Sequence, residues 1–305
     1  MDQANRAAWP ALPYTAWQDT CATLQLWTQV VGKIRLARAP MVNHWWQVVL
    51  YVSPRGLTTS PIPYGSEVFQ IDLDFLDHRL AITVSDGRVE QFALRAMSVA
   101  AFYAETMGRL RKLGIDIHIW TRPQEIVDAS PFEQDDHHAS YDATRVHEFW
   151  RVLVQADRVF NRFRSGFLGK VSPVHFFWGS FDLCVTRFSG RGAPPHPGGV
   201  PNMADWVTRE AYSREVSSAG FWPGNGGFGE AAFYSYAYPT PEGFADAEVT
   251  VPGASFNREL GEFTLPYDAV REASDPDALL LAFLQQTYAA AADCARWDRD
   301  ALERA

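Results

Sequence analysis

The stretch LAITVSDGRVEQFAL, residues 80–94, decides the class of fold. Two runs of β-branched and aromatic residues flank Asp86-Gly87, a dipeptide that favours a two-residue turn between antiparallel strands. The preceding stretch FQIDLDFL, residues 69–76, alternates apolar and polar residues as a half-buried strand does. Because such hairpin signals outweigh strand–helix–strand alternation, the sequence predicts an α+β fold with mostly antiparallel strands.

The order of the expected elements indicates two similar halves. The first has a helix over 17–31, a group of strands, and a helix that Ser98 caps and Gly114 ends. The second repeats this order, with a helix over 141–163 and a last helix from about Pro276. We therefore expect a first half over 1–130 and a second over 131–305, packed as one compact unit. An internal duplication would explain the repetition.

Composition narrows the classes of function. The 305 residues are 47% hydrophobic and 21% charged, which is typical of a globular protein. A net charge of −9 makes nucleic acid an unlikely partner. No apolar window is long enough for a membrane span, and the first residues lack a signal-peptide pattern, so we expect a cytoplasmic protein without membrane contact. The three cysteines are far apart, so we expect no disulfide and assign no metal ligand among them. We also expect no cofactor.

The stretch VHFFWGSFDLCVTRFSGR, residues 174–191, contains the best candidates for a site. Read as one strand, it places Trp178, Ser180 and Asp182 on one face, whose mixed character suits the wall of a pocket. Gly179 would form a bulge that brings His175 to the same face. We expect His175 and Asp182 to be the catalytic acid and base. The expected strands also include HWWQVVLYVS, residues 44–53, and IDIHIW, residues 115–120.

The surplus of basic residues around this stretch predicts the charge of the ligand. Between residues 162 and 214 there are seven Lys or Arg and three Asp or Glu, so the segment carries 7 − 3 = +4 in an acidic chain. Guanidinium groups bind carboxylates and phosphates in pairs of hydrogen bonds. We therefore expect a small anionic, partly aromatic or apolar ligand in a pocket lined by arginine and tryptophan. Its binding residues would be Trp178, Ser180, Arg187, Arg191 and Arg209.

Two further motifs have ordinary structural explanations. GNGGFG, residues 224–229, matches the dinucleotide pattern GxGxxG, but a strand-like stretch follows it where a dinucleotide site needs a helix. It is better explained as a hairpin loop. The segment 133–138, EQDDHH, offers carboxylates and imidazoles before the long helix. Asp135 and His138 could bind a metal or cap a helix, and the sequence leaves both open.

Several long motifs resemble a known family. The stretches LWTQVVGKIRL, NHWWQVVLYVSPRGLTTSPIP, GKVSPVHFFWGSFDLCVTRFSGR, REAYSREVSSAGFWPG and FYSYAYP are similar to those of a bacterial family of unknown function, domain-of-unknown-function family 5996. The resemblance extends from about Trp17 to the last helix. It does not identify any catalytic residue, because no activity is established for the family. It also includes a pattern matched here by Pro131, Phe132, Asp135, His138, Tyr141 and Asp142.

Two classes of function therefore compete. The first is an enzyme or binding protein for the small ligand described above. The second is a non-catalytic module that binds an unknown protein partner through exposed aromatic residues, which requires an apolar surface patch and no enclosed pocket. Binding of single-stranded nucleic acid through arginine and aromatic stacking is a weaker third possibility, which the acidity of the chain disfavours.

Overall fold

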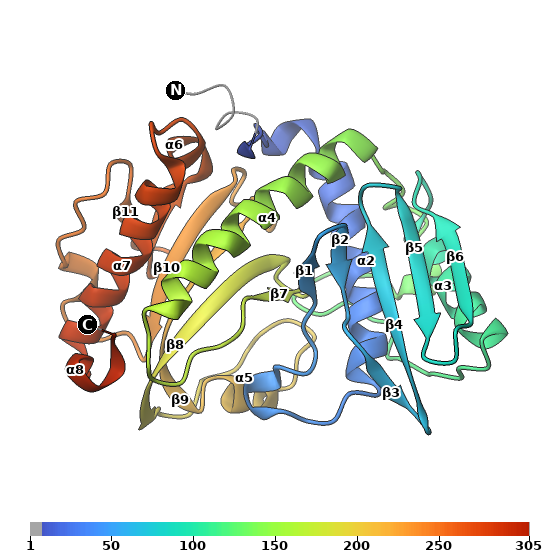
Figure 1. The fold of residues 1–305 in the computed structure, drawn as a ribbon, viewed down its shortest axis with the longest axis horizontal. Helices are drawn as coiled ribbons and strands as arrows, with labels where there is room; N and C mark the ends of the chain where they lie inside the picture. Colours follow the sequence, from blue (N-terminus) through green and yellow to red (C-terminus); the bar gives the residue numbers. More distant parts are fainter. Residues whose placement is uncertain (1–7, 305) are drawn as a thin grey trace.

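The structure, a computed structural model, describes residues 8–304 and contains two antiparallel sheets, one in each half of the sequence (Figure 1). The first has the order β1-β2-β4-β5-β6, with β3 paired to β4, and the second has the order β11-β12-β10-β9-β8-β7. The predicted α+β class is confirmed. The strands of the first sheet are β1 (Tyr51–Ser53), β2 (Gly56–Thr58), β3 (Ile62–Tyr64), β4 (Glu67–Asp74), β5 (Arg79–Val84) and β6 (Val89–Ala93). Those of the second are β7 (His175–Phe177), β8 (Asp182–Gly192), β9 (Arg214–Trp222), β10 (Ala232–Tyr238), β11 (Ser255–Asn257) and β12 (Glu262–Pro266).

Long helices cover one face of each sheet. In Figure 1, α4 crosses the second sheet diagonally with α7 beside it, while α3 packs beside β6 of the first. The helix α2 stands between the halves and contacts both α3 and α4. The α-helices are α2 (Gln18–Leu36), α3 (Val99–Lys112), α4 (Ala143–Ser165), α5 (Asp205–Ala211), α6 (Tyr267–Arg271), α7 (Pro276–Cys294) and α8 (Arg299–Leu302), and the 3-10 helices are η1 (Tyr14–Ala16), η2 (Asn43–Trp45), η3 (Phe132–Gln134) and η4 (Phe244–Asp246).

Local signals predicted several elements correctly. Strands β5 and β6 form the expected hairpin, with Gly87 at a φ of 93° in its turn. The Ser98 side chain accepts a hydrogen bond from the Ala101 amide at 3.1 Å and so caps α3, and Gly114 follows that helix with a φ of 73°. Helix α7 begins at Pro276. GNGGFG lies in the loop between β9 and β10, so the hairpin-loop interpretation is confirmed.

Two of the predicted strands are wrong in part, and a third is wrong altogether. Residues 44–53 begin with η2, where His44 and Trp45 have φ values of 60° and 62°, and only Tyr51–Ser53 forms a strand. Residues 115–120 form no strand, because Ile115, Ile117 and Ile119 are buried without a paired neighbour. Residues 174–191 form a hairpin in place of one strand. Its tight turn runs from Trp178 to Phe181, so Gly179 lies in the turn and makes no bulge.

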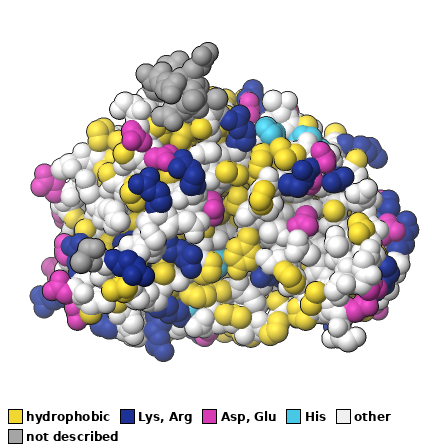
Figure 2. All heavy atoms as spheres, viewed as in Figure 1, with side chains coloured by type: hydrophobic (Ala, Val, Ile, Leu, Met, Phe, Trp, Pro, Cys, Tyr) yellow, Lys and Arg dark blue, Asp and Glu magenta, His cyan; other side chains and the backbone are white. Residues whose placement is uncertain are grey.

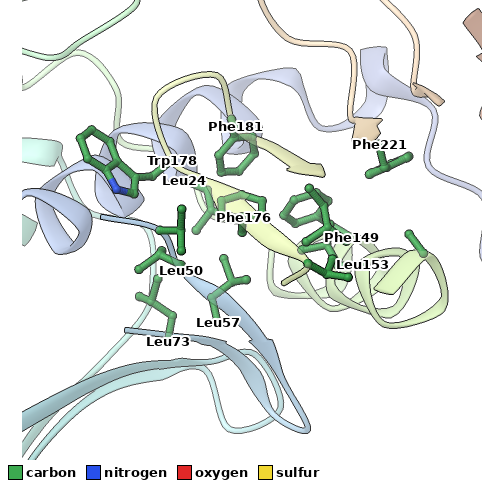
Figure 3. Packing of buried hydrophobic residues seen from close by; sticks show 14 of the residues in the cluster. Leu24, Leu50, Leu57, Leu73, Phe149, Leu153, Phe176, Trp178, Phe181 and Phe221 are labelled. Atoms are coloured by element: carbon green, nitrogen blue, oxygen red, sulfur yellow. The ribbon is translucent and has the colours of Figure 1, made fainter. Parts of the chain in front are cut away.

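The two halves share a core. The edge strands β1 and β7 meet beside Leu50 and Phe176, whose backbones exchange two hydrogen bonds of 2.9 Å. Figure 3 shows side chains of both halves packed in one buried cluster, among them Leu57, Leu73, Phe149, Leu153, Phe176 and Phe181. Each half contains a helix, antiparallel strands and further helices, but this order does not establish common ancestry, so the internal duplication stays a prediction.

The surface on the α4 side carries charges of both signs. Figure 2 shows Lys, Arg, Asp and Glu scattered over this face, with hydrophobic side chains gathered near its middle, between the two halves. Within residues 8–304, no helix has the length and apolar character that crossing a membrane requires.

A close approach of α2 to the hairpin turn fixes the position of the turn. The Trp178 indole lies against Gly32, where an added Cβ would be 2.2 Å from the ring. The same indole donates a hydrogen bond of 2.7 Å to the carbonyl of Val48. Only glycine therefore fits at position 32 of this buried helix.

We predict opposite effects of alanine at two glycines inside helices. Gly32→Ala should destabilise the protein by about 2–4 kcal/mol, because Trp178 must move out of a packed core. Gly108→Ala in α3 is the matched control. Its new Cβ would meet only the Arg111 guanidinium, at 3.9 Å, so higher helix propensity should stabilise the protein by up to about 1 kcal/mol. Urea unfolding of both variants measures the difference, and equal effects would contradict the close packing.

Candidate functional site

The face of the second sheet that points away from α4 and α7 carries most of the polar side chains of the site. Strand pairing aligns Cys184 with Gly220 and Gly220 with Tyr234 across β8, β9 and β10. An added Cβ at Gly220 would be 2.3 Å from the Tyr234 hydroxyl. The missing side chain therefore lets the Tyr234 phenol cross β9 and donate a hydrogen bond to Asp182 on β8.

Two open cavities lie over this face. The smaller, of about 600 Å³, we call the aromatic chamber. Its wall contains Trp45, Trp46, Trp120, Phe177, Trp178, Phe188 and Trp206. The larger, of about 1010 Å³, we call the acidic chamber. Its ionisable side chains other than tyrosine are Glu125, Asp128, Asp135, His137, His138, Asp182 and Glu262.

The two chambers meet at one group of residues, which we call the junction. It consists of the lining residues that the chambers share: Glu125, Gly179, Ser180, Asp182, Tyr212, Tyr234 and Tyr236. These residues come from the 120–130 loop, the β7–β8 turn, the start of β8, the segment after α5, and β10. A site assembled from five segments requires the complete tertiary fold.

Asp182 is the most buried carboxylate of the junction, with 7% of its surface exposed. Its carboxylate accepts hydrogen bonds from the Ser180 and Tyr234 hydroxyls. Burial raises the pKa of Asp182, and the two donated hydrogen bonds act in the opposite direction because they stabilise the charged form. Asp182 is therefore a carboxylate held in a fixed orientation.

Glu125 is the second carboxyl of the junction. Its backbone has a φ of 63°, and its amide donates a hydrogen bond of 2.8 Å to the Pro201 carbonyl. The carboxyl lies against Gly179, where an added Cβ would be 1.9 Å from Oε1. Within the described part of the chain, no side chain donates a hydrogen bond to this carboxyl. Burial, with the nearby Asp182 charge, raises the pKa of Glu125 to about 7.

Burial also raises the pKa values of one further carboxyl and of the tyrosines of the site. Burial and the Asp182 charge raise the pKa of Glu262, in the acidic chamber, to about 7. Burial raises the pKa of Tyr212 to about 12 and that of Tyr234 well above the ordinary tyrosine value. The Tyr212 and Tyr236 hydroxyls are 2.8 Å apart and bind each other. The junction therefore pairs one oriented carboxylate with a carboxyl that can hold a proton near neutral pH.

A buried polar stripe on α2 holds the loops that form the junction. Gln25, Gln29 and Lys33 recur every four residues and so share one side of the helix. The Gln25 amide donates to the Gly179 carbonyl at 2.7 Å, and Gln29 exchanges two hydrogen bonds with the backbone of Gln124, of 2.9 and 2.8 Å. The Lys33 ammonium donates to the carbonyls of residues 120 and 122, at 3.1 and 2.6 Å. This stripe fixes the loop that carries Glu125 relative to the turn that precedes Asp182.

The structure brings three of the sequence-predicted site residues together. Asp182 and Ser180 lie in the junction, and Trp178 lines the aromatic chamber. The Trp178 indole N–H donates its hydrogen bond to the Val48 carbonyl. A ligand in the chamber could therefore contact only the Trp178 ring.

His175 lies near these residues but outside both chambers. It pairs with Cys184 in the hairpin, and its ring meets those of Trp46 and Tyr51 at 5.6 Å and of Phe177 at 5.8 Å. Burial, followed by the positive charges of Arg35 and Arg164, lowers the pKa of His175 to about 3. The imidazole is therefore neutral at physiological pH and is enclosed by aromatic rings.

The three predicted arginines bind other parts of the protein. The buried Arg187 guanidinium lies 3.5 Å from the Phe163 ring centroid and 4.3 Å from that of Tyr288, between α4 and α7. Arg191 forms an ion pair of 2.6 Å with Glu215 and donates to carbonyls just after α7. The Arg209 guanidinium is half exposed on α5, 3.6 Å from the Asp205 carboxylate. None of the three lines either chamber as the described residues form them.

The loop around Asp135 caps a helix. The Asp135 carboxylate accepts hydrogen bonds from the amides of His137 and His138 and from the His138 ring, at 3.1, 3.0 and 2.8 Å. The carbonyls of Asp135 and His138 accept the first amides of α3. Across residues 8–304, no three His, Cys, Asp or Glu side chains are arranged to hold a metal ion.

Sequence reasoning missed Glu125, Glu262 and the α2 stripe. The stripe left a readable signal, since Gln25, Gln29 and Lys33 recur at four-residue spacing among the apolar residues of the helix. Glu125 left none, because it lies in an irregular loop that only tertiary contacts bring to Asp182.

The fold and the site define an α+β protein with a carboxyl-lined pair of chambers over one face of an antiparallel sheet. The model of a family of unknown function (DUF5996) matches residues 9–304, so the chain belongs to this family. Searches of the curated proteins and of the solved structures gave no match.

We predict that Glu125→Gln stabilises the protein at high pH. Because the pKa of this carboxyl rises from 4.5 in the unfolded chain to about 7 in the folded protein, wild-type stability falls as pH rises from about 4.5 to about 7 and stays at the lower level above it. The full shift corresponds to about 3 kcal/mol, and access of water to the chamber should reduce the gain at pH 8 to about 1–2 kcal/mol.

Urea unfolding at pH 4.5 and pH 8 measures this gain. The variant and the wild type should have equal stability at pH 4.5, where both carry an uncharged group at position 125. The matched control is Glu242→Gln, at an exposed position outside the chambers, which should change stability little at either pH. A pH-independent gain in Glu125→Gln would contradict the assignment.

Proposed function

We propose that the protein is an enzyme that binds a small molecule with an apolar or aromatic body and transfers a proton at Asp182 and Glu125. The observation that carries the proposal is the Glu125 carboxyl, which has no protein donor among residues 8–304 and borders Asp182 where the chambers meet. Groups with pKa values displaced by burial and by a charged neighbour, located in a cavity, are typical of catalytic sites.

The environments of the two carboxyls support different roles. Burial raises the pKa of Asp182, while its two hydroxyl donors stabilise the charged form and orient the carboxylate as a base. Glu125 has a pKa of about 7, so at neutral pH it can give a proton to a ligand and recover it from water. Two carboxyls in different hydrogen-bonding environments are a recurring basis of acid–base catalysis.

The aromatic chamber supports a small molecule as the ligand. Its volume of about 600 Å³ lies in the usual range for small-molecule sites. The walls are rich in aromatic side chains, and both carboxyls of the described lining, Glu125 and Asp182, lie at the junction. An apolar body would therefore be held with one end at the carboxyls. A protein-interaction module would not need two open chambers that converge on buried carboxyls.

The proposal keeps Trp178, Ser180 and Asp182 from the residues expected on sequence grounds and assigns proton transfer to Glu125 in place of His175. The lower pKa and the aromatic surroundings of His175 favour a packing role. An anionic ligand loses its expected partners, because Arg187, Arg191 and Arg209 bind other protein groups.

Turnover of metabolites tests this function. Wild-type protein, Glu125→Gln and Asp182→Asn would each be incubated with a small-molecule extract of bacterial cells and analysed by mass spectrometry. We expect the wild type to consume at least one compound, and each variant to do so about 10²–10⁴ times more slowly, which is the usual contribution of a positioned acid or base.

Arg209→Gln is the matched control for this experiment, because Arg209 is half exposed and outside both chambers. It should consume the same compound at the wild-type rate. Equal turnover by the two carboxyl variants and the wild type, with all proteins folded by circular dichroism, would contradict the proposal. A loss of turnover in Arg209→Gln alone would instead support the anionic ligand that the sequence predicts.

A further inference from the structure

Carboxyls dominate the ionisable side chains that line the two chambers. Five carboxyls line them: Glu125, Asp128, Asp135, Asp182 and Glu262. In the part of the chain that the structure describes, no lysine or arginine belongs to either lining. A cavity lined by carboxyls with low-dielectric walls concentrates cations and excludes anions.

The aromatic walls also favour a positive charge. Five tryptophans line the aromatic chamber, and the face of an indole ring attracts cations more strongly than other aromatic side chains do. Two of these rings already bind cations of the protein itself. The Lys33 ammonium is 4.7 Å from the Trp120 centroid, and the Lys170 ammonium is 5.0 Å from that of Trp46. Neither ammonium lines a chamber.

The carboxyls of the junction have acceptor capacity that no protein cation uses. Asp182 accepts hydrogen bonds from two hydroxyls, and the described residues provide no ion pair for Asp182 or Glu125. The nearby Lys33 ammonium is directed to the backbone carbonyls of residues 120 and 122. Two carboxyls that raise each other's cost of ionisation gain most from a cation placed between them.

We propose that the ligand is an amine, whose ammonium group lies at the junction between Glu125 and Asp182 and whose apolar body occupies the aromatic chamber. This inference rests on the proposed function, and it adds the charge and the orientation of the ligand. The ammonium group donates hydrogen bonds to the two carboxyls, while the tryptophan rings enclose the carbon skeleton.

Isothermal titration calorimetry with three compounds that share one aromatic body tests the inference. Tryptamine has an ammonium, tryptophol a neutral hydroxyl and indole-3-propionate a carboxylate, each on a two-carbon chain from the same indole. At pH 7.5 and low salt, tryptamine should bind the wild type at least about tenfold more tightly than tryptophol, which corresponds to about 1.4 kcal/mol. Indole-3-propionate should bind most weakly.

The carboxyl variants locate the source of this preference. Glu125→Gln and Asp182→Asn should each reduce the ratio of tryptamine to tryptophol affinity, and they should leave tryptophol binding within about threefold of wild type. Arg209→Gln should keep the wild-type ratio. This comparison is informative for any folded variant, because each protein serves as its own reference.

The outcomes separate the inference from the proposed function. Tryptophol or indole-3-propionate binding as tightly as tryptamine would overturn the amine and leave an aromatic ligand in place. A preference for tryptamine that persists in both carboxyl variants would also overturn it, because the ammonium would then lie elsewhere. If none of the three compounds binds the wild type, the aromatic chamber does not accept an aromatic amine and the inference is wrong, while the turnover experiment above still decides the proposed function.

Discussion

The buried polar stripe of α2 is the interaction on which the rest of the structure depends. A helix between two sheets would ordinarily be apolar on all sides, yet Gln25, Gln29 and Lys33 lie in its interior-facing surface. Gln29 and Lys33 bind backbone groups of the irregular 120–130 loop, and Gln25 binds the Gly179 carbonyl in the β7–β8 turn. Because an unpaired buried amide or ammonium is costly, the loops and the helix hold each other in one arrangement. That arrangement brings Glu125 to Asp182.

The same constraint explains why the site can be both precise and electrostatically unfavourable. Two carboxyls near each other in a partly buried cavity destabilise the folded state as both ionise. The shared core and the α2 hydrogen bonds offset this cost. Gly220 and Gly179 leave space for the Tyr234 phenol and for the Glu125 carboxyl, so both side chains reach positions that any larger residue would block. Stability elsewhere in the fold thus permits the displaced pKa values of the junction.

Local patterns predicted much of the fold and a part of the site. The Asp86-Gly87 hairpin, the Ser98 cap and the start of α7 depend on neighbours within a few residues, and all three are confirmed. Asp182 was found because a carboxylate stands out in an aromatic strand. In 174–191 the alternation of side chains continues through a tight turn, so the sequence predicts one strand there. Nothing in the local sequence indicates the positive φ of 64° at Phe181. Charge counting favoured an anion, because sequence does not show that Arg187 is stacked between aromatic rings of α4 and α7.

The sequence by itself determined the α+β class, the antiparallel pairing and the face of β8 that carries Asp182, because these follow from turn chemistry and from the alternation of side chains along a strand. Only the tertiary structure decided which groups meet that face. Glu125 reaches Asp182 across 57 positions of chain, through loops fixed by α2, and the arginines expected there bind elsewhere. Long-range packing and the need to satisfy buried polar groups therefore set the charge of the chambers, and neither is encoded in a local pattern.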